Sequence, residues 1–115
     1  MASINLNDLD TTVHGPVRLG ILSALQIDGP LDFWTLKKRL RTADGSLAMH
    51  LQKLEDVNYI AGKRQLVGKR PKTTYRMTSA GKKAFMDYLN KIQRLIDAIE
   101  DTTKHSIIKN SYKRP

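Results

Sequence analysis

The chain of 115 residues contains no cysteine, and its apolar runs, such as Gly20-Ile21-Leu22, are short. The missing thiols exclude a disulfide framework, a thiolate metal site and a cysteine nucleophile. A helix that crosses a bilayer needs about 20 consecutive apolar residues, so none of these runs can form one. The N-terminus also lacks the basic start and the apolar stretch of a secretory signal. We therefore expect a cytoplasmic protein with no membrane partner.

Motifs that carry catalysis are lacking as well. The sequence has no glycine-rich phosphate loop and no nucleophile motif, and His14, His50 and His105 are far apart. Glu55 and Asp56 are adjacent, but neighbours on a helix point about 100° apart and do not easily share one metal or substrate. We therefore expect no enzymatic activity, no cofactor and no bound metal.

Positive charge is abundant. Twenty Lys and Arg residues stand against eleven Asp and Glu residues, which gives a formal net charge of +9. The charge is also concentrated, because neither residues 62–76 nor residues 103–115 include an acid. A polarised cationic surface is typical of proteins that bind nucleic acid.

The N-terminal half predicts three short helices. Pro16 suits the first position of a helix over 16–26, and Asp32 suits the cap of a second helix. Thr42 can cap a third helix that runs to about Asn58. Only a short break separates the second helix from the third, which is the connection found in a helix-turn-helix unit.

The periodicity then changes from helical to extended. Strand-favouring residues between 59 and 77 flank a turn-forming segment at 68–72, so we expect a β-hairpin with a basic tip. Thr78 or Ser79 can cap a fourth helix that reaches about Asp101. The predicted fold class is α+β, mostly α: a winged helix-turn-helix with a long C-terminal dimerisation helix.

We expect the chain to form one domain, since its length suits a single modest core. Residues 1–78 are assigned to the winged helix DNA-binding part, and residues 79–102 to the dimerisation helix of the same domain. Residues 103–115 are assigned to a basic tail, which could contact either a second subunit or DNA.

Several segments, in this order, resemble a known family: His14–Leu19, Leu31–Phe33, Thr42–Leu47, His50–Glu55, Gly68–Thr73 and Met77–Gly81. The family comprises small single-domain winged-helix regulators of archaea and bacteria, related to the MarR and ArsR groups. The resemblance implies that His50–Glu55 belong to the recognition helix and Gly68–Thr73 to the wing. Asn58 stands where the family usually has glycine, and asparagine is the next best residue for a left-handed helix end. The absence of cysteine argues against metal sensing of the ArsR type.

The third helix is predicted to divide into a core face and a DNA face. If Leu47, Leu51 and Leu54 are buried, the opposite face is polar and turns away from the core. The N-terminal half of a recognition helix enters the major groove. We therefore predict DNA contacts from the residues on this face and at its edge: Thr42, Gly45, Ser46, Met49, His50, Gln52 and Lys53.

Side-chain chemistry assigns a role to most of these residues. Ser46 can bond to a phosphate or a base edge, Met49 can contact a thymine methyl, and Gln52 can pair with adenine. Lys53 lies further along the helix and is expected at a phosphate. His50 is expected to pack or to contact phosphate rather than to bind metal. The alternative for the whole face is a plain solvated surface.

The hairpin tip and the second helix supply further predicted contacts. The wing residues assigned to the DNA backbone or the minor groove are Lys69, Arg70, Lys72 and Thr73. Among them Arg70 is the expected groove reader, because guanidinium groups favour narrow minor grooves. The second helix can touch flanking phosphates through Lys37, Lys38 and Arg41. The alternative for the tip is a solubilising loop.

The fourth helix predicts a dimer. A helix from residue 79 to 101 is roughly 35 Å long, and a domain of this size covers only its first half. Its apolar seam continues beyond that half, which predicts a two-fold interface. The seam and the positions beside it comprise Phe85, Tyr88, Leu89, Ile92, Leu95, Ile96 and Ile99. The alternative is that the helix folds back over the first helix of its own chain.

The leading hypothesis is a homodimeric transcriptional regulator that binds double-stranded DNA in a sequence-specific way. Two other hypotheses stay open: a sequence-independent nucleic-acid binder of the chromatin type, and a winged helix that serves as a protein-interaction module. A small-molecule effector is conceivable, but nothing in the sequence supports one.

Overall fold

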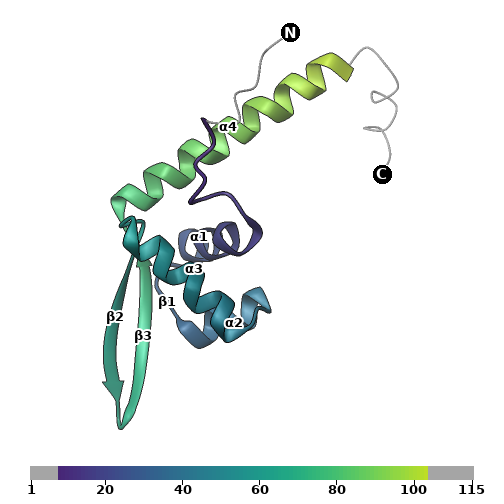
Figure 1. The fold of residues 1–115 in the computed structure, drawn as a ribbon. Helices are drawn as coiled ribbons and strands as arrows, with labels where there is room; N and C mark the ends of the chain where they lie inside the picture. Colours follow the sequence, from purple (N-terminus) through teal and green to yellow (C-terminus); the bar gives the residue numbers. More distant parts are fainter. Residues whose placement is uncertain (1–7, 104–115) are drawn as a thin grey trace.

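The computed structural model of the protein describes residues 8–103. Its helices and strands follow in the order α1 (Pro16–Asp28), β1 (Leu31–Asp32), α2 (Phe33–Leu40), α3 (Asp44–Asp56), β2 (Ile60–Val67), β3 (Arg70–Met77) and α4 (Ser79–Thr103). Figure 1 shows α1, α2 and α3 gathered on one side of α4, with the β2–β3 hairpin projecting away from α4. The predicted α+β winged helix is confirmed. The basic tail beyond residue 103 lies outside the described residues.

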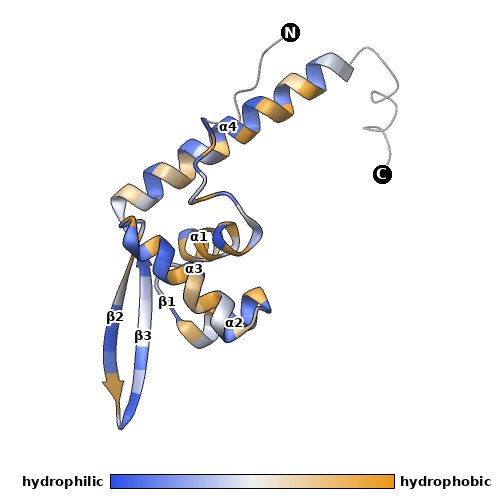
Figure 2. Ribbon diagram, viewed as in Figure 1, coloured by the Kyte–Doolittle hydropathy of each residue, from blue (hydrophilic) through white to orange (hydrophobic). Residues whose placement is uncertain are grey.

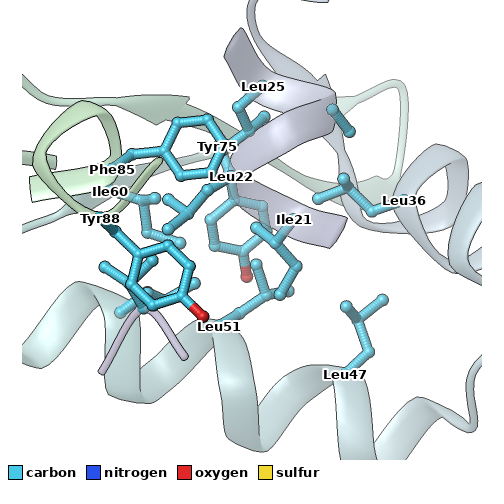
Figure 3. Close-up of a cluster of buried hydrophobic side chains, with 13 residues drawn as sticks. Ile21, Leu22, Leu25, Leu36, Leu47, Leu51, Ile60, Tyr75, Phe85 and Tyr88 are labelled. Atoms are coloured by element: carbon cyan, nitrogen blue, oxygen red, sulfur yellow. The ribbon is translucent and has the colours of Figure 1, made fainter. Parts of the chain in front are cut away.

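One apolar core joins the helices to the sheet. Figure 3 shows side chains from α1, α2 and α3 meeting those from the sheet and from α4 in one cluster. The predicted inward stripe of α3 is confirmed, because Leu47, Leu51 and Leu54 are all buried. This stripe orients α3, since a helix that buries one face must present the opposite face to solvent.

The first turns of α4 belong to this core. Phe85 and Tyr88 are only 3% and 4% exposed, and both pack among the residues of the domain core. Their assignment to a dimer interface was therefore wrong. Apolar residues recur along the whole of α4. The first of them, Phe85 and Tyr88, pack into the core, and the later ones lie where the helix extends beyond the core.

The caps of α2 and α3 differ. Asp32 caps α2 as predicted, because its carboxylate accepts a hydrogen bond from the Thr35 N–H at 3.2 Å. Hydrogen bonding to Thr35, first through its side chain and then through this N–H, lowers the pKa of Asp32 against the opposing effect of partial burial. The prediction that Thr42 caps α3 was wrong: Ala43 occupies the cap position without a side-chain bond. The carboxylate of Asp44 instead lies in the first turn, where it suits the positive end of the helix dipole.

The sheet is larger than predicted, with strand order β1–β3–β2. β1 was not predicted, because two residues carry no periodicity; it pairs with β3 at residues 74 and 75. The turn at the hairpin tip is only Gly68-Lys69 rather than 68–72, and Gly68 has the positive φ of 65° that suits such a turn. Pro71 lies inside β3, beyond the reach of β1, where β3 is an edge strand and proline is tolerated.

A compact junction joins α3, β2 and α4. Asn58 has a positive φ of 62°, the predicted left-handed conformation, and turns the chain from α3 into β2. Thr78 caps α4: its hydroxyl donates to the Asn58 carbonyl at 2.6 Å and accepts from the Gly81 N–H at 3.0 Å. The Thr78 N–H donates to the Tyr59 carbonyl oxygen at 3.1 Å. These bonds fix the start of α4 against the end of α3.

The segment before α1 packs onto α4. The Asp10 carboxylate accepts hydrogen bonds from the Tyr59 hydroxyl and the Thr12 N–H, at 2.6 and 2.8 Å. The bond to Asp10 is the main reason why the pKa of Tyr59 is raised to about 12. Nδ1 of His14 lies 2.6 Å from the Tyr88 hydroxyl, and Lys91 donates to the Asp8 carbonyl. No local pattern of residues indicates these contacts.

A polar contact also joins α1 to α3. Nε of Arg18 donates to Nδ1 of His50 at 3.0 Å. The pKa of His50 is lowered, first by partial burial and then by the positive charges of Arg18 and Lys53. The neutral imidazole is therefore the form that the folded protein favours.

The junction makes the first testable prediction. A Cβ atom at Gly81 would lie 2.7 Å from the carbonyl carbon of Tyr59 and 2.9 Å from its Cα, so Gly81→Ala forces backbone apart. We expect a loss of about 1–3 kcal/mol in the free energy of unfolding, measured by urea denaturation. Gly45→Ala is the matched control, because a Cβ there meets nothing within 4 Å. An unchanged stability of Gly81→Ala would contradict this account of the junction.

The Arg18–His50 contact predicts a dependence of stability on pH. The unfolded chain binds a proton at His50 near the ordinary pKa of 6.5, whereas the folded protein resists it. Stability from this group is therefore complete above 6.5 and is lost as the pH falls toward the lowered folded pKa. His50→Gln should lose less stability than the parent chain between about pH 7.5 and 5. Parallel stability curves for the two proteins, from denaturation without DNA, would refute the assignment.

Candidate nucleic-acid interface

The outward face of α3 is exposed, as predicted. Gly45, Gln52 and Lys53 are exposed, Met49 has 48% of its surface accessible, and Ser46 is half-buried. Figure 1 shows α3 running from the base of the hairpin toward α2, with its N-terminal end on the side away from α4. The end of α3 that the sequence assigns to the major groove is therefore unobstructed within the described chain.

Three residues that were predicted to contact DNA, two in α3 and one just before it, are not free on the surface. Each is hydrogen-bonded within the chain or half-buried. Gln52 donates to the Asp56 carboxylate at 2.8 Å, one helical turn away, so it must leave this bond to reach a base. His50 is half-buried, and its Nδ1 is occupied by Arg18. Thr42 is half-buried in the α2–α3 turn.

The exposed side of α2 mixes charge with one large aromatic ring. Lys37 forms an ion pair of 2.6 Å with Asp44 of α3, and its ammonium lies 5.5 Å from the centroid of the Trp34 ring. Lys38 and Arg41 are exposed. Trp34 was not among the predicted residues, although 58% of its surface is accessible. A spacing of three and four residues from Trp34 to Lys37 and Lys38 was the signal that could have identified it.

The wing presents positive charge without a compensating acid. Lys69, Arg70 and Lys72 are exposed, and Thr73, further from the tip, is half-buried. Within residues 8–103, none of these three cations forms an ion pair. Lys72 also contributes to the lowered pKa of Asp32, which shows that the wing strand passes close to the start of α2. The wing and the two helices of the helix-turn-helix unit are thus neighbours.

The second half of α4 extends beyond the domain core with an apolar face. Leu89, Ile96 and Ile99 are 38%, 44% and 54% exposed, whereas Ile92 and Leu95 are half-buried. Figure 2 shows hydrophobic positions recurring along this half of the helix. Five of the seven residues predicted for a dimer interface therefore lie outside the fully buried core.

A cavity of about 450 Å³ lies between the segment before α1 and the first turns of α4. Its lining is mixed in character: Asp8, Leu9, Asp10, Tyr59, Ala80, Lys83, Ala84, Asp87, Tyr88 and Lys91. No group of three or more His, Asp or Glu side chains within residues 8–103 is arranged to hold a metal ion. In the same range, no helix is long and apolar enough to cross a bilayer.

Comparison with known proteins agrees with this geometry. Residues 17–96 match the winged helix DNA-binding domain family. The uncharacterized protein MJ0432 of Methanocaldococcus jannaschii is 36% identical over 84 residues, which cover 73% of this chain and 91% of the relative. The match spans all three helices of the helix-turn-helix core and most of α4.

Solved structures show the same fold. A transcriptional regulator homologue from Pyrococcus horikoshii OT3 superposes with a TM-score of 0.72 at 26% identity, over 77% of this chain and 88% of that one. The YusO protein from Bacillus subtilis gives a TM-score of 0.73 at 18% identity, over 84% and 68% of the two chains. The resemblance to MarR-like regulators is confirmed, and this class is not a class of enzymes. The chain belongs to the winged helix DNA-binding domain family.

Proposed function

We propose that the protein is a transcriptional regulator that binds double-stranded DNA in a sequence-specific way as a homodimer. One observation carries the proposal: the N-terminal end of α3, where Gly45 and Met49 are exposed, and the cationic hairpin tip both lie on the side of the molecule away from α4 (Figure 1). A duplex that receives α3 in its major groove would therefore run past the wing as well.

In this proposal α3 reads bases and its flanks hold the backbone. Ser46 and Met49 stand on the exposed face near the N-terminal end, where a recognition helix meets base edges. Met49 would contact a thymine methyl, and Gln52 would exchange its bond to Asp56 for an adenine. Lys38 and Lys53 would contact phosphates, which position the helix without reading sequence.

The wing supplies the main electrostatic grip. Lys69, Arg70 and Lys72 form no ion pair within the described residues, so DNA phosphates would meet cations whose charge is not already paired. Each phosphate contact releases counterions, which makes the affinity fall with salt. Arg70, at the first position of β3, would reach the minor groove.

A second copy would cover the distal face of α4, the apolar face that extends beyond the domain core. The predicted dimerisation helix, residues 79–102, makes up most of α4. At 1.5 Å per residue α4 is about 37 Å long, so it extends past the core that its first turns cover. Pairing two such helices would bury Leu89, Ile96 and their neighbours. It would also offer two α3 helices to successive major grooves, about 34–36 Å apart.

Selection of duplexes from a genomic pool, with the mass of the complex measured in parallel, tests this function. We expect enrichment of a pseudo-palindromic site and a complex with two chains per duplex. Equal retention of random and genomic duplexes at moderate salt would instead support a sequence-independent binder. Co-purification of a stoichiometric protein with no DNA retention would support an interaction module.

The wing assignment predicts the effect of removing its charge. Changing Lys69, Arg70 and Lys72 together to Ala should weaken duplex binding and reduce the slope of log affinity against log salt by up to about 5.4, since both chains of the dimer lose three phosphate contacts. Changing Lys82, Lys83 and Arg94 to Ala is the matched control, because these exposed cations lie on α4 and the net charge changes equally. Equal losses in both variants would show that only overall charge matters.

The dimer assignment predicts the effect of a charge on the distal face of α4. Ile96→Glu should convert a dimer of about 26 kDa, twice the 13.0 kDa chain, into a monomer, since a carboxylate would have to be buried. Asn90→Glu adds the same charge on the exposed opposite side and should leave the dimer intact. Light scattering at micromolar concentration distinguishes these outcomes. A monomeric parent chain would refute the homodimer directly.

A further inference from the structure

The wing tip exposes apolar side chains where the domain has nothing to cover them. Leu66 and Val67 are 73% and 57% accessible, whereas no side chain of the core exceeds 8%. Figure 2 shows this hydrophobic end of β2 at the far tip of the hairpin, the part of the chain furthest from α4. These side chains therefore do not contribute to the packing of the domain.

The register of the hairpin places these two residues on opposite faces. Leu66 pairs with Pro71, and Val67 pairs with Arg70. Side chains alternate between faces along a strand. Leu66 and Pro71 therefore share the face of Tyr75, which lies four positions along β3 from Pro71 and closer to the core. Tyr75 is buried, and its pKa is raised by burial and then by Glu55 of α3. Leu66 therefore extends the α3-facing side of the hairpin beyond the end of the domain.

The surroundings of Leu66 are strongly cationic. Residues 63–72 contain five Lys or Arg side chains and no acid. None of the five forms an ion pair within the described chain. A purely apolar partner would leave these charges without solvation, so the partner must combine an apolar surface with negative charge on both sides. The minor groove of duplex DNA has this character, with sugar edges as walls and phosphates along both rims.

We propose that Leu66, supported by Pro71, enters the minor groove next to the major groove that α3 occupies and packs against the deoxyribose edges. Lys69 and Lys72 hold the phosphates along the rims, while Arg70 reaches into the same groove. The contact rests on the proposed function, since it requires that duplex DNA is the partner. It adds an apolar, salt-independent component to binding, and it is specific to one face of the wing.

Leu66→Ser tests the contact, and Val67→Ser is the matched control on the opposite face. Binding of the full chain to a labelled duplex of about 30 base pairs, recovered from the genomic selection, is measured across a salt series. Leu66→Ser should weaken binding about tenfold or more, the effect of exposing one buried leucine, with the salt slope unchanged. Val67→Ser should change the affinity less than about threefold. Lys69→Ala should reduce the salt slope by about 2, one phosphate contact in each of the two chains.

Hydroxyl-radical footprinting locates the contact, because the radical attacks deoxyribose from the minor groove. The parent chain and Val67→Ser should protect the sugars that flank the α3 site, and Leu66→Ser should expose them. Thermal melting of both variants should match that of the parent chain, since neither side chain belongs to the core.

Each other outcome has a defined meaning. Binding and footprint unchanged in Leu66→Ser would overturn the inference while the proposed function stands. A loss of self-association without a loss of DNA binding would overturn it in favour of a contact between copies. A parent chain that binds no duplex would remove the proposed function itself, and the inference with it.

Discussion

The arrangement of the candidate DNA-binding elements depends on the close approach of Tyr59 to the first turn of α4. The Tyr59 carbonyl accepts from Thr78, the Thr78 hydroxyl bridges to Asn58, and only a glycine fits at position 81. These contacts join the end of α3, the start of β2 and the start of α4 within a few residues. The direction of the wing and the direction of α4 are therefore set together, relative to one helix.

Several acidic side chains make contacts within the fold, whereas many of the cationic side chains in the described part of the chain remain exposed and unpaired. Asp32 caps α2, Asp10 binds Tyr59, and Asp44 pairs with Lys37, so these three carboxylates are engaged close to the surfaces they stabilise. The hairpin has no acid near its tip. A fold that satisfies its carboxylates internally presents an unbalanced positive surface, and this surface is where a polyanion gains most from binding.

Much of the candidate site was predictable because it is encoded locally. The leucines of α3 recur at helical spacing and therefore share one face of the helix. Met49 and Gln52 must then lie on the opposite, outward face, whatever elements pack against the leucines. Lys69 and Arg70 lie beside Gly68, whose turn composition places them at a hairpin tip. The bond between Gln52 and Asp56, by contrast, is one of several that the side chain could make, and spacing alone does not select it.

The sequence by itself determined the order of the elements, the buried face of α3 and the cationic tip of the hairpin, because periodicity and turn chemistry act over a few residues. Only the tertiary structure decided which partner covers each apolar face. Phe85 and Tyr88 continue the same seam as Ile96, yet they close the domain core while Ile96 stays exposed. The contact of Arg18 with His50 likewise joins residues 32 positions apart. Such choices depend on how whole elements meet in space, which no local pattern of residues encodes.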